Sequence, residues 1–443
     1  MSLLLAVAAG VLMASMAGAW NGGRPGRHPG SEPRFFHCLA EGESPPEFHW
    51  PGHTGPTHPF DAWLKRFAHG MWRFQQRWLA SWRADNCVRL NEIQVLGTHN
   101  SYKIEPAESL FAILSFFLGA LAEGFEYTHL PLDEQFETQG IRQIELDVFA
   151  DPEGGFYAAP AGPRVVDEAG MPPGPENDPE GLLEEPGLKV LHVQDIDFRS
   201  TCLTFVRCLQ VIKAWSDVNP RHLPIMVLVE AKDEPIPDPG FGFVVPLAFD
   251  AEALDQIDAD IRSVFPDRQL IAPDDVRGGR ATLEEAVLLD GWPTLKKSKG
   301  RVLFALDNGG ALRELYLEGH PSLEGRALFV SSSPGEPHAA FMKMNNPLSE
   351  PGLIAERVAA GYIVRTRADS DTYEARHDLT GKRDAALASG AQYVSTDYPV
   401  PDPDFGTDYQ VEIPDGAPAR CNPVNAPPGC DSSKLELRIE RRR

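Results

Sequence analysis

The chain has 443 residues, 42% of them hydrophobic, which is enough to bury a large core and to build more than one average domain or a single barrel with extensions. Its formal net charge is −23, with Lys and Arg clustered in the final RIERRR, and this acidity argues against a nucleic-acid binder and against electrostatic docking to anionic lipid. The acidity fits a soluble protein, or a divalent cation held by several carboxylates.

The N-terminal residues predict export from the cell. Residues 1–19 hold an apolar stretch that ends in small residues in an A-x-A pattern, at Ala17 and Ala19, as in secretory signal peptides. A basic region at the start is missing, so a membrane anchor is the alternative interpretation. We expect a signal peptide over residues 1–19, cleavage after Ala19, and a secreted or periplasmic protein.

Residues 20–90 are predicted to form an N-terminal extension. Its first part, up to residue 60, is rich in Pro, Gly and His, and the histidine spacing matches no metal site, so an exposed loop is the better interpretation. Residues 60–84 carry apolar side chains at steps of three and four, which predicts one helix.

Short β-rich runs with nearly continuous apolar cores follow. The eight runs begin at Ile93, Arg142, Leu188, Pro224, Arg301, Arg326, Gly361 and Ala391. Such runs are typical of strands that are buried on both faces. Helix-like stretches lie between several of them, for example at residues 204–218 and 351–361. The alternation predicts an α/β fold, a (β/α)8 TIM-like barrel over residues 91–411.

Three segments interrupt or follow this pattern. Residues 151–187 are rich in Pro, Gly and Glu and predict a long loop inserted between the second and third strands. Residues 109–125 are apolar but shorter than the ~20 residues of a membrane-spanning helix, and we favour a buried helix over an exposed flap that touches lipid. Residues 412–443 are expected to form an irregular tail pinned by its cysteines.

An even number of cysteines in an exported chain predicts disulfide bonds. Closeness in sequence pairs Cys202 with Cys208 and Cys421 with Cys430, and this leaves Cys38 to pair with Cys87. Because no two cysteines have C-x-x-C spacing, a zinc site is not expected.

In (β/α)8 barrels the catalytic residues lie at the carboxyl ends of the strands. Polar residues interrupt the apolar runs at these ends: His99, Asn100, Glu145, Asp147, His192, Asp195, Asp197, Glu230, Lys232, Asp307, Arg365, Arg367, Asp397 and Tyr398. Because Glu145 and Asp147 are two residues apart on one predicted strand, their side chains point to the same face.

These residue types suggest a chemistry. The oxygen ligands that hard cations such as Ca²⁺ or Mg²⁺ prefer are offered by four residues, Asn100, Glu145, Asp147 and Glu230. Histidines on two strands can share general base and acid work. Lys232, with Arg365 or Arg367, can neutralise a phosphate. A metal, two imidazoles and a cationic clamp together favour cleavage of a phosphodiester.

Each feature alone also has a structural interpretation. A lone strand-end histidine is more often structural than catalytic, a Glu-x-Asp on a strand is often an ordinary ion pair, and Arg365 would then only balance the carboxylates. Asp195 and Asp197 are equally suited to cap a following helix. The number of polar exceptions at the ends of apolar strands favours the functional interpretation.

The motifs GTHNSY, LPLDEQFETQGIRQIELDVFADPEGG, LKVLHVQDIDFRSTCLTFVRCL, HLPIMVLVEAKD, RTRADSDT and GAQYVSTDYPVPD occur in this order over residues 91–402. Here the chain resembles the secreted, Ca²⁺-dependent phosphoinositide-specific phospholipase C-like proteins of bacteria and fungi. The wider phosphatidylinositol phosphodiesterase superfamily is similar in its barrel and its paired histidines.

The resemblance implies roles for individual residues. His99 would contact the phosphate, and His192 would be the general acid that protonates the diacylglycerol oxygen. The four residues that would bind Ca²⁺, rather than Mg²⁺, are Asn100, Glu145, Asp147 and Glu230. Lys232 and Arg367 would hold phosphate or inositol hydroxyls, and Arg365, Asp397 and Tyr398 are added as candidate substrate contacts. The first proton acceptor stays open between Glu145, Glu230 and His99.

The implied partner is a phospholipid at a membrane surface, with no nucleic acid, no evident protein partner and a monomeric state. A glycerophosphodiester phosphodiesterase on the same barrel is the nearest alternative, although that family usually has Arg where this chain has Asn100. A secreted binding protein that has lost its activity is the other alternative.

Overall fold

Parallel strands form a barrel in the part of the chain that the computed structural model describes, residues 81, 84–349, 352–414 and 418–436. The eight barrel strands are β1 (Ile93–Thr98), β2 (Gln143–Phe149), β4 (Ile225–Ala231), β5 (Val302–Leu306), β6 (Leu328–Val330), β7 (Phe341–Lys343), β8 (Ile363–Arg367) and β9 (Tyr393–Thr396). Their order is β6-β5-β4-β2-β1-β9-β8-β7, and a parallel bridge from Ser331 to Phe341 joins the two ends. The predicted TIM-like barrel is confirmed.

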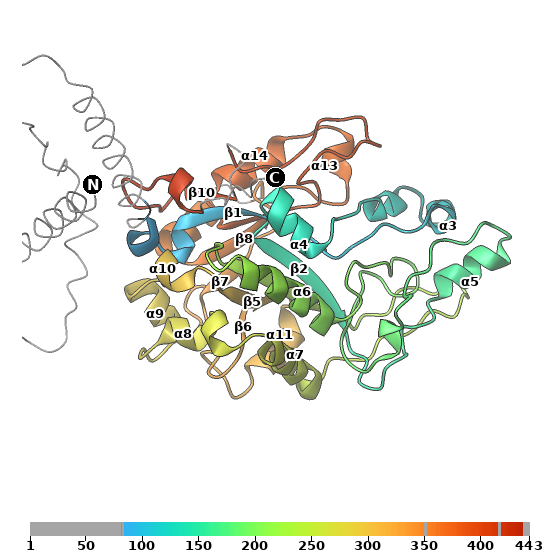
Figure 1. The fold of residues 1–443 in the computed structure, drawn as a ribbon, viewed down its shortest axis with the longest axis horizontal. Coiled ribbons are helices and arrows are strands. Elements are labelled where there is room, and N and C mark those ends of the chain that lie inside the picture. The colour runs from blue at the N-terminus through green and yellow to red at the C-terminus, as the bar shows by residue number, and fades with distance from the viewer. Residues whose placement is uncertain (1–80, 82–83, 350–351, 415–417, 437–443) are drawn as a thin grey trace, which may run out of the picture. The chain divides into compact units, whose positions relative to one another are not determined.

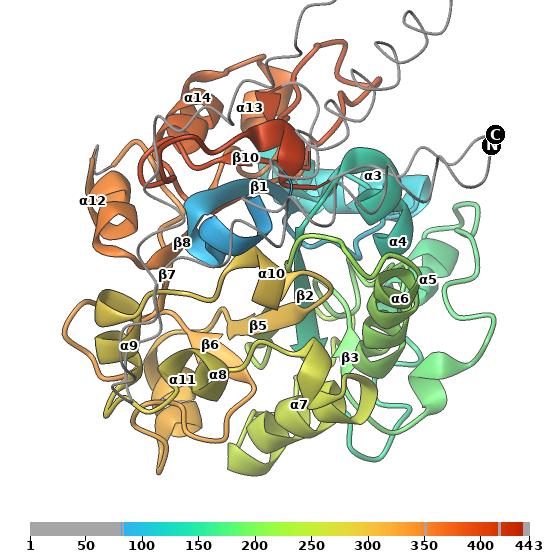
Figure 2. The same cartoon turned by 60° about the vertical axis from the view of Figure 1, so that its left-hand side comes forward.

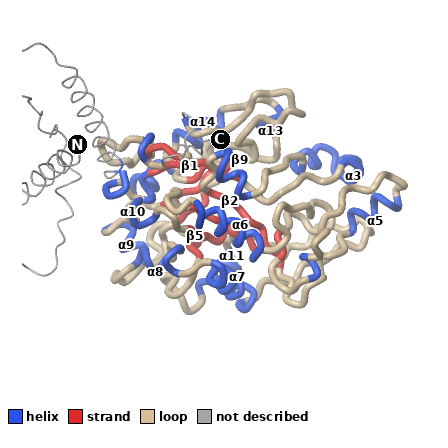
Figure 3. The backbone as a smooth tube through the Cα atoms, viewed as in Figure 1, coloured by secondary structure: helices blue, strands red, loops and turns tan. Residues whose placement is uncertain are grey.

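Helices surround the strands (Figure 2). They are α3 (Glu108–Leu118), α4 (Leu132–Glu134), α5 (Ala161–Glu168), α6 (Phe205–Val218), α7 (Ala251–Val264), α8 (Pro273–Arg277), α9 (Leu283–Leu289), α10 (Leu295–Ser298), α11 (Gly310–Leu317), α12 (Leu353–Ala360), α13 (Tyr373–Arg376) and α14 (Gly381–Ala388). In Figure 3 the strands lie at the centre, and the segments that carry α3 and α5 are mostly loop.

Burial explains why these segments form their elements. Every residue of β2 and β5 is buried, as expected for parallel strands covered on both faces. On α6 the Thr204 side chain accepts a hydrogen bond from the Arg207 amide and starts the helix, and Leu209 and Ile212 face the core. The predicted helices at residues 204–218 and 351–361 are therefore confirmed as α6 and α12.

The third predicted strand was wrong. The run from Leu188 contains β3 (Lys189–Val190), which pairs antiparallel with the end of β2 and is not part of the barrel wall. The eighth wall strand is instead β7, whose three residues are too few to give a periodic signal. His192 therefore lies on a loop beyond β3, not at the end of a barrel strand.

Two other segments differ from expectation. Residues 151–187 are not only loop, because they contain α5. Residues 109–125 form α3 and the 3-10 turn η2 (Gly119–Phe125), but the expected burial was wrong: only one face is covered, and Phe116 is 83% exposed. Apolar composition alone does not distinguish a covered helix from an uncovered one.

The C-terminal tail takes part in the fold. Strand β10 (Ala419–Cys421) pairs antiparallel with the start of β1, so the tail is not wholly irregular. Within the tail Glu436 forms an ion pair with Arg142 and accepts a hydrogen bond from the Leu223 amide. This end of the barrel is opposite the carboxyl ends of the strands.

The predicted disulfides Cys202–Cys208 and Cys421–Cys430 are confirmed. Cys87 is also disulfide-bonded, and its expected partner Cys38 lies outside the described residues. The signal peptide and most of the N-terminal extension, including most of the helix at residues 60–84, lie outside them as well; residues 84–87 are helical.

We predict that buried His222 makes stability depend on pH. Its ring is 3% exposed and hydrogen-bonded to Ser216 Oγ at 2.7 Å, and burial lowers its pKa to about 4. The unfolded chain would take up a proton on His222 below about pH 6.5, whereas the folded protein would do so only near pH 4. The free energy of unfolding should therefore be highest above pH 6.5 and fall as the pH is lowered toward 4.

Urea unfolding between pH 7 and pH 4 measures this effect. His222→Gln cannot take up the proton, so its pH slope should be smaller than that of the wild type by up to about 1.4 kcal/mol per pH unit. Equal slopes for the two proteins would rule out His222 as a source of the pH dependence.

Candidate active site

The barrel brings most of the predicted site residues to one end, the carboxyl ends of β1, β2, β4, β8 and β9. Asp147 on β2 stands directly opposite Glu230 on β4 in the strand register. His99 and Asn100 follow β1, and the Ser101 amide donates to the Glu145 carbonyl at 3.0 Å, which ties this turn to β2. Neighbouring parallel strands thus bring together residues that are far apart in sequence.

Three carboxylates form the centre of the site. Glu145, Asp147 and Glu230 each place one oxygen within 4.8 Å of the others. Burial raises the pKa of Glu145 to about 7, against the opposing effect of Arg365, and raises the pKa of Asp147 well above its usual range. Three acids this close repel one another, so the cluster favours a bound cation.

Orphaned polar atoms test whether a metal fits here. Among the described residues, neither Asp147 oxygen has a hydrogen-bond partner, and Asn100 Oδ1 is likewise buried and unpaired. The Asn100 side-chain nitrogen donates to the Tyr127 hydroxyl at 3.0 Å, so Oδ1 is the atom of this amide that is left free. An all-oxygen donor set with unused lone pairs is the set that Ca²⁺ prefers, so the residues fit this ion.

Lys232 supplies positive charge to the same cluster. Its ammonium lies 3.5 Å from Asp147 Oδ2 and 3.7 Å from Glu230 Oε1. Burial alone would lower the pKa of Lys232, but Asp147 and Glu230 outweigh it and hold that pKa above its usual range. The predicted phosphate-binding lysine is therefore paired with candidate metal ligands in this structure.

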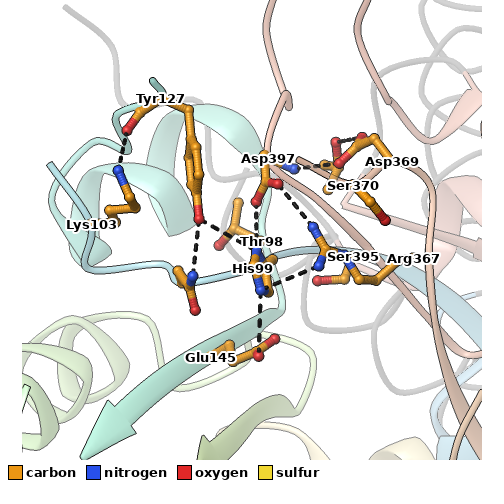
Figure 4. A network of polar contacts seen from close by, with 12 residues as sticks. Thr98, His99, Lys103, Tyr127, Glu145, Arg367, Asp369, Ser370, Ser395 and Asp397 are labelled. Atoms are coloured by element: carbon orange, nitrogen blue, oxygen red, sulfur yellow. Dashed lines mark hydrogen bonds and ion pairs between the residues drawn. The ribbon is translucent and has the colours of Figure 1, made fainter. Parts of the chain in front are cut away.

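His99 is held from both sides (Figure 4). Its Nδ1 lies 2.9 Å from Asp397 Oδ1, and its Nε2 lies 3.4 Å from Arg367 Nη1 and 3.9 Å from Glu145 Oε1. Burial and then the Arg367 charge lower the pKa of His99 to about 3. The imidazole is therefore neutral, with Nδ1–H donated to Asp397 and an unprotonated Nε2 facing Glu145.

Asp397 in turn is fixed by the barrel. The Arg367 guanidinium donates to it at 3.0 Å, and its backbone amide donates to Asp369 at 2.9 Å. Burial alone would raise the pKa of Asp397, but His99 and Arg367 hold it below its usual range. Asp397 thus stays ionised and orients His99.

The second histidine has its own carboxylate. His192 Nδ1 lies 2.6 Å from Asp197 Oδ2, and the fully buried Lys103 lies 3.3 Å from the same oxygen. His192 lines a cavity of about 670 Å³ together with Glu230, Lys232, Asp307 and Lys343. Glu230 therefore belongs both to the carboxylate cluster and to the cavity of His192, and it links the two halves of the site.

Two predicted substrate contacts lie deeper than expected. Arg365 is 1% exposed, and its guanidinium donates to Glu145, to Asn345 at 2.6 Å and to Ser395 at 3.2 Å. Tyr398 is 2% exposed and packs against Tyr409. These positions favour a supporting role for both side chains, and their contact with substrate stays a prediction.

Sequence reasoning missed other members of the site. Lys343 pairs with Asp307 in the cavity but lies on the unpredicted strand β7. Lys103 supports Asp197 through a contact between two loops, and no sequence pattern indicates it. Neither Asp195 nor Asp197 caps α6; Asp195 accepts from the amide of Ala161 at the start of α5.

Comparison with known proteins identifies relatives. A family model described as "Phosphoinositide phospholipase C, Ca²⁺-dependent" matches residues 88–423. A calcium-dependent phosphoinositol-specific phospholipase C from Pseudomonas sp., in its apo form, is similar in structure, with 17% sequence identity and a TM-score of 0.44 over 76% of this chain and 96% of that one. No curated protein matches the chain significantly.

Two further solved structures are similar. The Ca²⁺-dependent phosphatidylinositol-specific phospholipase C from Streptomyces antibioticus has 18% identity and a TM-score of 0.43, covering 71% of this chain and 96% of its own. The phosphatidylinositol-specific phospholipase C from Listeria monocytogenes has 11% identity and a TM-score of 0.37, covering 70% and 89%.

We predict that Ca²⁺ binds at the carboxylate cluster and raises the thermal unfolding midpoint of the protein. Asp147→Asn removes one charged ligand, so the same shift should need at least about tenfold more Ca²⁺. Asp260→Asn is the matched control, because Asp260 is a buried acid on α7 that accepts a hydrogen bond from Gln256 at 2.7 Å. An unchanged Ca²⁺ response in Asp147→Asn would contradict the assignment.

Proposed function

The chain belongs to the Ca²⁺-dependent phosphoinositide phospholipase C family, whose members are phosphoric diester hydrolases, and we propose that it cleaves phosphatidylinositol-type phospholipids to diacylglycerol and inositol phosphate. The observation that carries the proposal is the position of Glu230, which belongs to the carboxylate cluster and also lines the cavity of His192. A cation, a candidate base and a candidate acid could then act on a single phosphodiester.

Ca²⁺ held by Glu145, Asp147, Glu230 and Asn100 would lower the pKa of the attacking hydroxyl and stabilise charge on the phosphate oxygens. The inositol hydroxyl loses its proton as it attacks phosphorus. His99 Nε2 and Glu145 Oε1, 3.9 Å apart, are two candidate acceptors at this corner. Asp397 orients His99 with Nε2 free to accept, whereas the higher pKa of Glu145 makes that carboxylate the stronger base, so the first acceptor stays open between His99, Glu145 and Glu230.

His192 is the proposed general acid. Its Nδ1 donates to Asp197, which stabilises the protonated ring and leaves Nε2–H for the departing diacylglycerol oxygen. The phosphorus–oxygen bond to diacylglycerol breaks as this proton is transferred. These two events leave a cyclic inositol phosphate. Water then opens this ring: His192 takes a proton from the water, and the first acceptor returns its proton to the inositol oxygen.

The cationic side chains are proposed to hold the phosphate. Arg367 lies beside His99, and Lys232 and Lys343 line or border the cavity of His192. Each is paired with a carboxylate in this structure, Arg367 with Asp397 and Lys343 with Asp307. A phosphate that entered between them would share these cations with the acids.

Export is part of the proposal. Two disulfides within the described residues fit a protein that folds in an oxidising compartment. The A-x-A pattern at Ala17 and Ala19 supports a signal peptide that is cleaved after Ala19.

Both alternatives remain testable beside this proposal. A glycerophosphodiester phosphodiesterase would use the same barrel, and an inactive binding protein would keep the cavity without turnover. The intact pairs His99–Asp397 and His192–Asp197 support an active enzyme, since each histidine has the carboxylate that general acid–base catalysis needs.

A substrate panel separates the three functions. We expect Ca²⁺-dependent release of inositol phosphate from phosphatidylinositol vesicles, loss of this activity in EDTA, and recovery on adding Ca²⁺ in excess. Turnover of glycerophosphodiesters without lipid cleavage would favour the first alternative. Binding of inositol phosphates without any turnover would favour the second.

We predict that His192→Ala lowers the rate of phosphatidylinositol cleavage by about 10²–10⁴-fold, because the leaving oxygen loses its proton donor. Asp197→Asn should lower it less, since His192 stays in place but loses the carboxylate that orients its ring. His377→Ala is the control, because that imidazole is exposed at the end of α13. Full activity of His192→Ala would refute the assigned acid.

A further inference from the structure

A second cavity, of about 560 Å³, lies at the other end of the barrel from the candidate active site. Two of its lining residues, Pro220 and Arg301, precede β4 and β5 in the chain, so the cavity is at the amino ends of these strands. Along β4, Glu230 follows Ile225 by about 16 Å. In Figure 1 α10 lies where β1 begins, away from the arrowhead of β2. The two cavities are therefore separate.

The lining of this second cavity is strongly basic, and we call it the basic cavity. Residues 296–301 read KKSKGR, in which four of six side chains are cationic, although the chain as a whole has a net charge of −23. Among the described residues, the lining holds one acid, Asp275, and five cations: Arg268, Lys296, Lys297, Lys299 and Arg301. Cations gathered in a concave surface raise the local concentration of anions.

The carboxylates at this end of the barrel do not neutralise the lining. Asp85 pairs with Lys299 at 2.6 Å, so one of the five cations is already balanced. Asp275 accepts a hydrogen bond from the Ala272 backbone amide at 3.1 Å, which ties it to the start of α8. Within the part of the chain that the structure describes, the other four cations form no ion pair. The basic cavity thus keeps positive charge that no acid of the fold balances.

The backbone around the cavity is held in place. The Gly300 amide donates to the His222 carbonyl at 2.9 Å, and Gly300 has a φ of 74°. A Cβ at this position would lie 2.5 Å from the Pro220 carbonyl oxygen, so the lysine-rich turn packs directly on the turn before β4. The Ile271 amide donates to Val302 at 2.9 Å and fixes the opposite wall. The cavity is therefore preformed.

The charge of the lining indicates the chemical class of the ligand. A carboxylate carries one negative charge and would leave most of the lining unbalanced, whereas each phosphate monoester carries about two and offers three acceptor oxygens. Lysine binds phosphate as a point charge, and arginine can donate two parallel hydrogen bonds to it. A volume of about 560 Å³ is within the usual range for a small-molecule site.

We propose that the basic cavity binds a small, multiply phosphorylated anion, at a site separate from the candidate active site. The phosphate groups could be those of a free polyphosphate or those of an inositol phosphate. A small ligand is favoured over a nucleic acid or an anionic membrane, because a chain of net charge −23 would repel an extended polyanion beyond the cavity. The site does not depend on the proposed function.

Isothermal titration in EDTA tests binding without turnover. The full chain is titrated at one ionic strength with pyrophosphate, with a soluble inositol trisphosphate and with sulfate. We expect saturable binding of pyrophosphate, at least about tenfold tighter than that of sulfate, because pyrophosphate carries more charge and more acceptor oxygens. The inositol trisphosphate arm distinguishes the two sources, since a cavity that takes inositol phosphates binds it as well.

Variants assign the binding to the cavity. Lys296→Gln, Lys297→Gln should weaken pyrophosphate binding at least about tenfold, because two charge-assisted contacts are lost. Lys296→Arg, Lys297→Arg keeps both charges and should stay within about threefold of the wild type. The matched control is Arg207→Gln, Lys434→Gln, which removes the same charge from positions outside the lining and should change the affinity by less than about twofold.

The candidate active site also carries cations, so a further variant separates the two sites. Lys232→Gln removes one of them and should leave the binding that depends on Lys296 and Lys297 within about twofold of the wild type.

Four outcomes would overturn the proposal. The first is equal phosphate binding by Lys296→Gln, Lys297→Gln and the wild type. The second is an equal loss in the matched control, which would show an effect of net charge alone. The third is a loss in Lys232→Gln only, which would place the ligand in the active site. The fourth is binding of anionic vesicles or RNA by a wild type that binds neither soluble phosphate, which would show an extended surface.

Discussion

The site depends on one electrostatic constraint, the concentration of buried negative charge at the ends of β2 and β4. Glu145, Asp147 and Glu230 cannot all be ionised at such short separations without nearby positive charge. Arg365 pairs with Glu145 and Lys232 lies 3.5 Å from Asp147 Oδ2, but neither Asp147 oxygen accepts a hydrogen bond, so these two cations do not satisfy every acceptor. A divalent ion at this place would complete a charge balance that the protein leaves unfinished.

The two histidines have similar partners but different supports. His99 is oriented by Asp397, which the barrel holds through Arg367 and the Asp369 carboxylate. His192 is oriented by Asp197 on a loop, and Lys103 connects that loop to Phe125 at the end of η2. The first pair is thus supported by barrel strands, and the second by contacts between loops.

Sequence patterns were sufficient where a long strand carries its own signal. The barrel and the grouping of Glu145, Asp147 and Glu230 could be predicted because these strands are long and buried on both faces, and two disulfides could be predicted because their cysteines are close in sequence. The count of eight strands was correct only because the run at Leu188 was included while β7 was missed. Lys103 and the exposure of α3 depend on contacts between loops, which no local pattern encodes.

The pairing of β1 has a consequence for how the chain reaches its native state. At Val95 the strand β1 pairs with β9 on one side and with β10 on the other, and both are made about 300 residues later, so that only β2 is available early. The barrel therefore cannot close on an incomplete chain. The topology delays closure of the barrel wall until β9 has been made, and the export proposed above would need the chain to stay unfolded while it crosses a channel.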